Sequence, residues 1–185
     1  AVPALIQALG DSDSRVCRVA AEVLGKLGDP QAVPALIQAL GDWDEYVRRA
    51  AAEALGAIGD PQAVPALSVW AHAGEDAARS ALQTLRHSVL DLPQAVAQVA
   101  AQGAWSMLIR ALPNEKVREA VVGLGTPAVP ALIKALEDSD EYVRRAAAEA
   151  LVQIGTPAVP ALVKALRDSS EYVRRAAAEA LVQIG

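Results

Sequence analysis

The residues best suited to chemistry are charged and aromatic side chains that recur at helical spacing. Glu45, Arg49 and Glu53 lie at positions i, i+4 and i+8, and Tyr46 follows Glu45. On a helix these positions share one face, where each glutamate–arginine pair stabilises by roughly 0.2–0.5 kcal/mol. Two interpretations remain open. The face is a solvated helix surface, or it presents tyrosine and arginine, which are enriched at binding hot spots, to a partner.

The same face recurs later in the chain, so the candidate site is a series and not a point. Trp43 is added to it, because this residue replaces the serine of a G-D-S-D turn and is expected to be exposed, as a contact residue or by accident. The candidate partner-binding residues are Trp43, Tyr46, Arg49, Glu53, Tyr142, Arg145, Glu149, Tyr172, Arg175 and Glu179. The uniformity of the series favours a scaffold role, since a selected binding groove usually varies between units.

Other reactive residues are too scattered for catalysis. The one cysteine, Cys17, has no histidine near it in sequence, and His72 and His87 lie 15 residues apart without a converging cluster. No glycine-rich phosphate loop, G-x-S-x-G elbow or H-E-x-x-H motif occurs. We therefore predict no enzyme activity, no catalytic residue, no cofactor and no metal site.

The elements that position these residues are copies of one helix. Residues 141–155 read EYVRRAAAEALVQIG, residues 171–185 repeat this sequence letter for letter, and residues 45–59 differ only at Gly56 and Ala57. A second apolar helical pattern precedes each copy, so each unit of about 30 residues is predicted to be a helical hairpin. Short helices of this kind are marginal alone, and stacking is expected to bury their apolar faces.

Glycine, aspartate and proline mark the predicted helix ends. A glycine closes each second helix, an aspartate or threonine caps the next helix, and a proline occupies its first position. A second proline about one turn later is expected to bend that helix. The residues are, in that order, Gly28, Asp29, Pro30 and Pro34; Gly59, Asp60, Pro61 and Pro65; Gly125, Thr126, Pro127 and Pro130; and Gly155, Thr156, Pro157 and Pro160. The last residue of each polar turn is expected to cap the second helix.

Six units are predicted, and the middle two are irregular. Their boundaries are about 1–28, 29–59, 60–91, 92–125, 126–155 and 156–185, with 60–125 irregular. Unit three is expected to continue as a helix over Asp76–Leu90, and Pro113-Asn114 to split or kink a helix of unit four. Whether the first helix of unit four starts near residue 93 or spans Ala104–Leu112 stays open. Trp70 and Trp105 are expected to fill this less regular core, with a geometric role for the break.

Two further roles are assigned to single positions. Arg48, Arg144 and Arg174 follow the first valine of their helices, and we expect them to bind turn aspartates such as Asp42 or Asp138 in adjacent units. Cys17 stands at the same position in unit one and is interpreted as a tolerated small residue.

Composition limits the class of protein. Hydrophobic residues make up 53% of the 185 residues but none is phenylalanine, which suits closely packed helices. The net charge of −5 argues against binding nucleic acid through its phosphates. No long apolar run predicts a membrane span, and the single cysteine favours a reducing, cytoplasmic location. Because Ala1 begins inside a unit and Gly185 follows no polar capping helix, we expect a fragment of a longer protein.

The pattern AVPALIxAL, a D-x-D turn, VRRAAAEAL and a closing I-G resembles the HEAT-repeat family, most of all the short repeats of phycobilisome lyases, which also served for artificial repeat libraries. The resemblance implies an all-α fold, an α-solenoid with a right-handed superhelix whose second helices line the concave face. It places Ala50 and Ala57, with the corresponding residues of units five and six, beside the candidate residues. Unit one departs from this pattern, with Ser14, Arg15, Arg18, Val19, Glu22 and Lys26.

We therefore hypothesise a non-enzymatic scaffold that binds a protein partner along this face, with no nucleic acid and no membrane. Exposed terminal units would also allow end-to-end self-association. The alternatives are a bilin lyase or chromophore chaperone, which pigment titration without a spectral change would eliminate, and an artificial or consensus-designed repeat protein.

Overall fold

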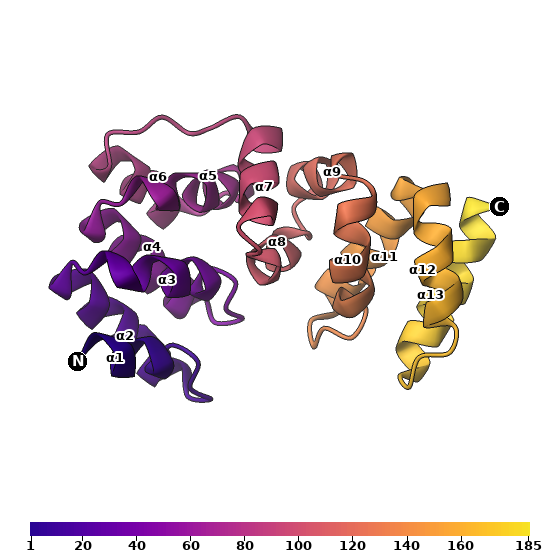
Figure 1. The fold of residues 1–185 in the computed structure, drawn as a ribbon, viewed down its shortest axis with the longest axis horizontal. Helices are drawn as coiled ribbons and strands as arrows, with labels where there is room; N and C mark the ends of the chain where they lie inside the picture. The colour runs from indigo at the N-terminus through magenta and orange to yellow at the C-terminus, as the bar shows by residue number, and fades with distance from the viewer. The chain divides into compact units, whose positions relative to one another are not determined.

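The computed structural model describes residues 1–185, and the fold is all-helical, an α-solenoid of stacked hairpins as the sequence predicts. It has 13 α-helices, four short 3₁₀-helices and no strand. The chain divides into two compact units, residues 1–110 and 111–185 (Figure 1).

The helices of the first unit are α1 (Val2–Ala8), α2 (Ser14–Leu27), α3 (Val33–Ala39), α4 (Glu45–Ile58), α5 (Val64–Ala73), α6 (Asp76–Thr84) and α7 (Leu92–Ala101). Helix α8 (Trp105–Ala111) ends one residue beyond the boundary. The second unit contains α9 (Glu115–Gly123), α10 (Val129–Ala135), α11 (Glu141–Ile154), α12 (Val159–Ala165) and α13 (Glu171–Ile184). The 3₁₀-helices are η1 (Pro30–Ala32), η2 (Pro61–Ala63), η3 (Thr126–Ala128) and η4 (Thr156–Ala158).

Aspartate caps begin three of the second helices, α2, α4 and α11, as predicted. The carboxylates of Asp13, Asp44 and Asp140 accept hydrogen bonds of 2.8–2.9 Å from backbone N–H groups two residues later. Ser170 makes no such bond at α13, so the predicted cap is wrong there. The side chain of Arg15, and then its backbone N–H, lower the pKa of Asp13 to about 2. Stability from this exposed carboxylate is therefore present above its ordinary pKa and lost as the pH falls through about 2.

The first helices start in two steps. A 3₁₀ turn precedes the α-helix, and the second proline, such as Pro34, is the second residue of that α-helix, so it does not bend a continuous helix. Asp29 and Asp60 cap their 3₁₀ turns as predicted. Thr126 and Thr156 do not, because each is already the first residue of its turn and a glycine with positive φ takes the cap position.

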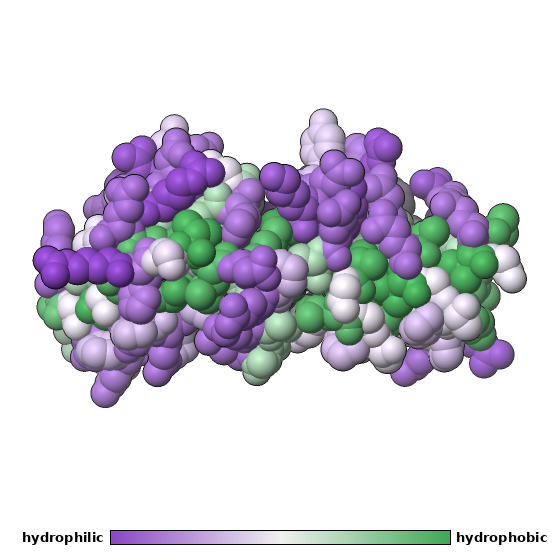
Figure 2. All heavy atoms as spheres, turned by 90° about the horizontal axis from the view of Figure 1, so that it is seen from above, coloured by the Kyte–Doolittle hydropathy of each residue, from purple (hydrophilic) through white to green (hydrophobic).

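Leucine and alanine side chains form the core of each of the two compact units, residues 1–110 and 111–185. Leu36, Leu55 and Leu67 in the first unit, and Leu132 and Leu151 in the second, are completely buried. Helix α4 packs between α2 and α6, while α11 packs against α9 and α13. In each unit, hydrophobic atoms form a central band, and hydrophilic side chains gather along its edge (Figure 2). Burial of this apolar surface is the main term that stabilises the stack.

In the first irregular repeat unit, about residues 60–91, the second helix is shorter than predicted. Helix α6 stops at Thr84, so the prediction of a helix to Leu90 was wrong. Arg86 has φ 57°, a left-handed conformation that a helix cannot continue through. The segment after it is held to α5, since Leu90 donates its N–H to Ser68 Oγ at 3.0 Å and accepts from His72 Nε2 at 2.9 Å.

The second irregular segment contains three helices where two were expected. Helix α7 packs against α5, and α8 coincides with the alternative in which Ala104–Leu112 forms the first helix. Pro113 lies in the turn between α8 and α9, so the predicted split occurs there. Trp70 is buried as expected, whereas Trp105 is only half-buried.

Candidate protein-binding grooves

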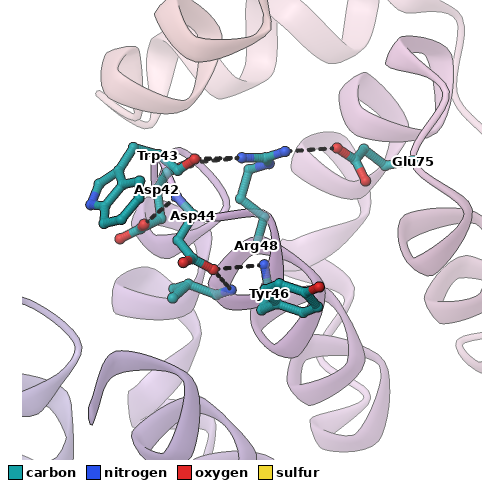
Figure 3. Close-up of polar contacts among 7 residues, drawn as sticks. Asp42, Trp43, Asp44, Tyr46, Arg48 and Glu75 are labelled. Carbon is teal, nitrogen blue, oxygen red and sulfur yellow. Dashed lines mark hydrogen bonds and ion pairs between the residues drawn. The ribbon is translucent and has the colours of Figure 1, made fainter. Parts of the chain in front are cut away.

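An arginine clamp fixes the turn that leads into each second helix. Arg144 Nη1 donates to the carbonyl oxygens of Asp138 and Ser139 at 2.7 and 2.9 Å, and Arg174 does the same at Asp168 and Ser169, at 2.8 Å each. Arg48 contacts the carbonyls of Asp42 and Trp43 at 3.2 Å (Figure 3). The predicted contacts to turn aspartates such as Asp42 and Asp138 therefore form, but they lie within each arginine's own unit, not in adjacent units, and they involve the backbone carbonyls and not the carboxylates. Those carboxylates, such as Asp42, instead accept the backbone N–H two residues later.

In units one and two the donor or its other contacts differ, but the carbonyl of the turn aspartate is still bound. In unit one, the buried thiol of Cys17 donates to the carbonyl of Asp11 at 3.2 Å, and burial raises its pKa. The thiol therefore replaces the guanidinium as a structural donor, consistent with the interpretation as a tolerated residue. In unit two, Arg48 also reaches Glu75 at 3.3 Å (Figure 3). Its guanidinium lies over the ring of Trp70, 5.3 Å from the ring centroid.

Helical spacing allows two glutamate–arginine pairs on the candidate face of each helix, and the structure forms the second of them, between the arginine and the glutamate four residues later. Arg49 contacts Glu53 at 3.0 Å, Arg145 contacts Glu149 at 3.1 Å, and Arg175 lies 3.5 Å from Glu179. Unit one has the corresponding pair, Arg18–Glu22. The hydrogen bond that Arg49 donates to the Glu53 carboxylate raises the pKa of Arg49. Their exposure limits each of these pairs to a small contribution to stability.

A groove of about 500 Å³ lies between α4 and the start of α6 in the first unit. Its charged lining residues are Glu45, Arg49, Glu53, Glu75 and Asp76. Three of the four carboxylates already form ion pairs, Glu53 with Arg49, Glu75 with Arg48, and Asp76 with Arg79 at 2.8 Å. The groove is therefore polar but largely neutralised.

A second groove, of about 230 Å³, lies between α9 and α11 in the second unit. The structure brings the predicted residues Tyr142, Arg145 and Glu149 together here. It adds Pro113 and Arg118, which the sequence analysis did not select. Arg118 follows the first valine of its helix as the clamp arginines do, so the K-V-R sequence of residues 116–118 was the available signal.

The aromatic residues of the series are exposed but not all line grooves. Tyr46, Tyr142 and Tyr172 are 68, 75 and 68% exposed, at the same position of α4, α11 and α13. Trp43 is 66% exposed, as predicted, and its side chain points away from Arg48 (Figure 3). Tyr46 and Trp43 are not among the residues that line the α4–α6 groove, whereas Tyr142 lines the α9–α11 groove.

Glu75 and Asp76 were also missed by the sequence analysis. They begin α6 after a shortened turn, and only the stacking of α6 on α4 places them opposite Glu45 and Arg49.

No three of the histidine, cysteine, aspartate and glutamate side chains come together as metal ligands would. His72 binds the Leu90 backbone, and His87 is exposed.

None of the helices has by itself the length and apolar character of a membrane span. Taken together, the segments Glu141–Ile154 and Thr156–Ala165 reach that length and composition, but they are bent by 112° relative to each other.

Comparison with known proteins identifies the repeat. The profile of the family described as HEAT repeats matches residues 2–86 and 104–182. The comparison with curated proteins found no match.

Several solved structures are similar to this chain, including the following three. An engineered protein is 22% identical over 99% of this chain and 96% of its own, with a TM-score of 0.40. Human deoxyhypusine hydroxylase in complex with glycerol is 22% identical over 99% and 84%, with a TM-score of 0.42. The complex of CpcE and CpcF of phycocyanin lyase from Nostoc sp. PCC7120 is 28% identical over 98% and 76%, with a TM-score of 0.41. At TM-scores below 0.5, none of them bears on the function of this chain.

Proposed function

Since the chain belongs to the HEAT-repeat family, we propose that it is a non-enzymatic scaffold that binds a protein partner along the surface of its second helices. The observation that carries this proposal is the exposure of the same tyrosine in three helices, with Tyr46, Tyr142 and Tyr172 each at least 68% exposed. Tyrosine is a frequent hot-spot residue, because it offers a large rigid apolar surface and a polar hydroxyl. Leaving three such rings in water at one repeated position favours a contact surface over a packing role.

The surroundings of these tyrosines support the same proposal. The Arg49–Glu53, Arg145–Glu149 and Arg175–Glu179 pairs are exposed and lie on the same helices, so they supply charged groups beside each ring. The clamp arginines fix the turn before each helix, which holds the tyrosine position rigid. A rigid surface loses little conformational entropy on binding.

The test is affinity capture from an extract of the source cells by the immobilised protein, with mass spectrometry of the captured proteins. The triple variant Tyr46→Ala, Tyr142→Ala, Tyr172→Ala is expected to lose specific captured proteins at an unchanged melting temperature. Lys134→Ala with Lys164→Ala, two exposed positions on the first helices, is the control and is expected to retain them. A triple variant that only lowers the melting temperature would show that the tyrosines are packing residues.

Self-association is a second proposal, carried by one difference between identical helices. Val152 of α11 is half-buried beside α13, whereas its counterpart Val182 of α13 is 82% exposed. On α2, Val16 and Leu27 are also exposed, whereas their counterparts in α4, Val47 and Ile58, are fully buried and half-buried. We propose that these apolar faces associate end to end between copies. Sedimentation of the pure protein that stays monomeric at all concentrations would contradict this proposal.

A further inference from the structure

One arginine of the clamp series is not used in the way its counterparts are. In α11 and α13, Nη1 of Arg144 and of Arg174 each contacts two turn carbonyls at 2.7–2.9 Å. Short charge-assisted bonds of this kind hold a guanidinium firmly. These two arginines are therefore committed to the turns of their own units.

Arg118 occupies the same position in α9 but has lost most of these bonds. The turn before α9 reads Leu112-Pro113-Asn114 in place of the D-S-D sequence. Arg118 Nη1 keeps only the carbonyl of Leu112, at 3.4 Å, and its Nε has no hydrogen-bond partner. Its side chain is nevertheless only 15% exposed. A guanidinium offers five N–H donors, and burying them without strong acceptors is costly, so this group is poised to take one.

Arg118 lines the α9–α11 groove together with a second arginine. Arg118 Nη2 lies 3.5 Å from Glu149 Oε2, and Arg145 Nε lies 3.1 Å from Glu149 Oε1. Two guanidinium groups thus share one carboxylate, which leaves one positive charge in excess among the residues that line the groove. Glu115, Lys116 and Glu119 on α9, and Glu141 on α11, are not among the lining residues.

We propose that the α9–α11 groove binds a carboxylate side chain from an acidic segment of the partner protein. The planar guanidinium matches a carboxylate in shape, and Arg118 is the group left with unused donors. Tyr142 and Pro113 form the adjoining wall, which would pack against the apolar part of an aspartate or glutamate side chain. This proposal rests on the proposed function, because it names the chemistry of the partner at one groove of the same surface.

The net charge of the chain makes the proposal specific. At −5, the protein as a whole repels an acidic peptide, so nonspecific attraction cannot imitate this site. Binding of an acidic peptide therefore requires a local positive site. The Nε of Arg48 also lacks a hydrogen-bond partner, but Arg48 lines a pocket of only about 10 Å³, whereas Arg118 lines the groove of about 230 Å³.

The test titrates the full chain with a fluorescently labelled polyglutamate peptide, read by fluorescence anisotropy at low salt. Polyglutamine of equal length is the neutral control peptide. The exposed Arg145→Gln variant is expected to weaken binding of polyglutamate by roughly tenfold or more. Glu149→Gln removes the internal carboxylate that competes for both arginines, so it is expected to strengthen binding. Arg175→Gln, at the same helix position in α13, is the matched control and should leave binding unchanged.

Each contrary outcome overturns the proposal. Polyglutamate that binds no better than polyglutamine up to roughly 1 mM would do so, as would equal losses for Arg145→Gln and Arg175→Gln. Free glutamate that binds as tightly as the peptide would assign the groove to a small molecule and contradict a protein partner. If the peptide fails while the triple tyrosine variant still loses captured proteins, the carboxylate site is refuted and the proposed function stands. If the peptide does not bind and the triple tyrosine variant captures the same proteins as the unchanged chain, both the carboxylate site and the proposed function are refuted.

Discussion

The stack of α2, α4 and α6 in residues 1–110 and the pair α11 and α13 in residues 111–185 are built from nearly the same helix but pack differently. Where the first stack has Gly25 and Gly56, the second pair has Val152 and Val182. A Cβ on Gly25 would lie 2.8 Å from Ala54 Cα, and one on Gly56 would lie 2.9 Å from Ala81 Cα. Helices α11 and α13 approach each other less closely along their length. Glycine at this position therefore lets α2 and α6 approach α4 to backbone contact, and we expect a valine there to prevent it.

The grooves differ in the same two regions. The α4–α6 groove, beside the glycine contact, is lined by four carboxylates and one arginine, and three of those carboxylates are in ion pairs. The α9–α11 groove has two arginines and one glutamate. A repeat protein of uniform sequence can thus offer chemically different surfaces, because single substitutions at the turn or the stacking position change what each groove exposes.

The largest expected effect concerns the leucine that both regions bury in the same way. Leu55→Ala and Leu151→Ala are each expected to lower the free energy of unfolding by roughly 2–5 kcal/mol, since both side chains are completely buried. Leu181, the counterpart in α13, is only half-buried and is expected to cost less. Urea denaturation followed by circular dichroism measures all three. Equal losses at Leu151 and Leu181 would show that α13 gains protection from something other than α11 and α12.

A smaller effect is expected when the first region is given the residue of the second. Gly56→Val places a side chain against the Ala81 backbone, so α4 and α6 must separate, at a cost of roughly 1–3 kcal/mol. The α4–α6 groove should widen with it. The reverse change, Val152→Gly, removes a half-buried side chain without relieving any clash. If Gly56→Val unfolds at the same urea concentration as the unchanged protein, the glycine contact does not control the stacking distance.

The smallest effect is a control for glycine itself. Nothing lies within 4 Å of a Cβ added to Gly123, in α9, and its φ is not positive. Gly123→Ala is therefore expected to raise the free energy of unfolding by roughly 0.5–1 kcal/mol through helix propensity. Gly56→Ala, which gains the same propensity but meets Ala81, should not be stabilised. Thermal melts of the two variants, compared side by side, separate propensity from packing.

Much of the fold follows from the sequence, because each regular unit carries its own signals. Aspartate caps, closing glycines and the apolar stripes predict the hairpins, and Asp44 and Gly59 behave as expected. The irregular segment could not be predicted in the same way. Helix α6 ends at Thr84 without a glycine or proline to stop it, and Arg86 beyond it has a positive φ. Ser68 and His72 hold Leu90 through contacts that span about 20 residues. Only the replacement of the expected isoleucine by Ser68, a buried polar residue, pointed to such a contact.

The candidate site was predictable in part. Helical spacing gave the Arg–Glu pairs, and Tyr142, Arg145 and Glu149 do share a groove. The role of Arg118 was not visible, because the sequence does not show that its guanidinium reaches only one turn carbonyl, that of Leu112, where Arg144 reaches two. Local patterns give the helix face, whereas groove chemistry depends on which neighbouring helix stacks against it.

The central claim is that the second helices, and not the first, meet the partner. The most direct measurement places a photo-crosslinking amino acid at Tyr46, Tyr142 and Tyr172 in turn, and at Lys134 and Lys164 on the first helices, and irradiates the protein in an extract of the source cells. Crosslinks to the same partner from the three tyrosine positions, with none from the two lysine positions, are predicted. Crosslinks that arise mainly from Lys134 and Lys164 would contradict the account, because they would place the partner on the opposite layer of the hairpins.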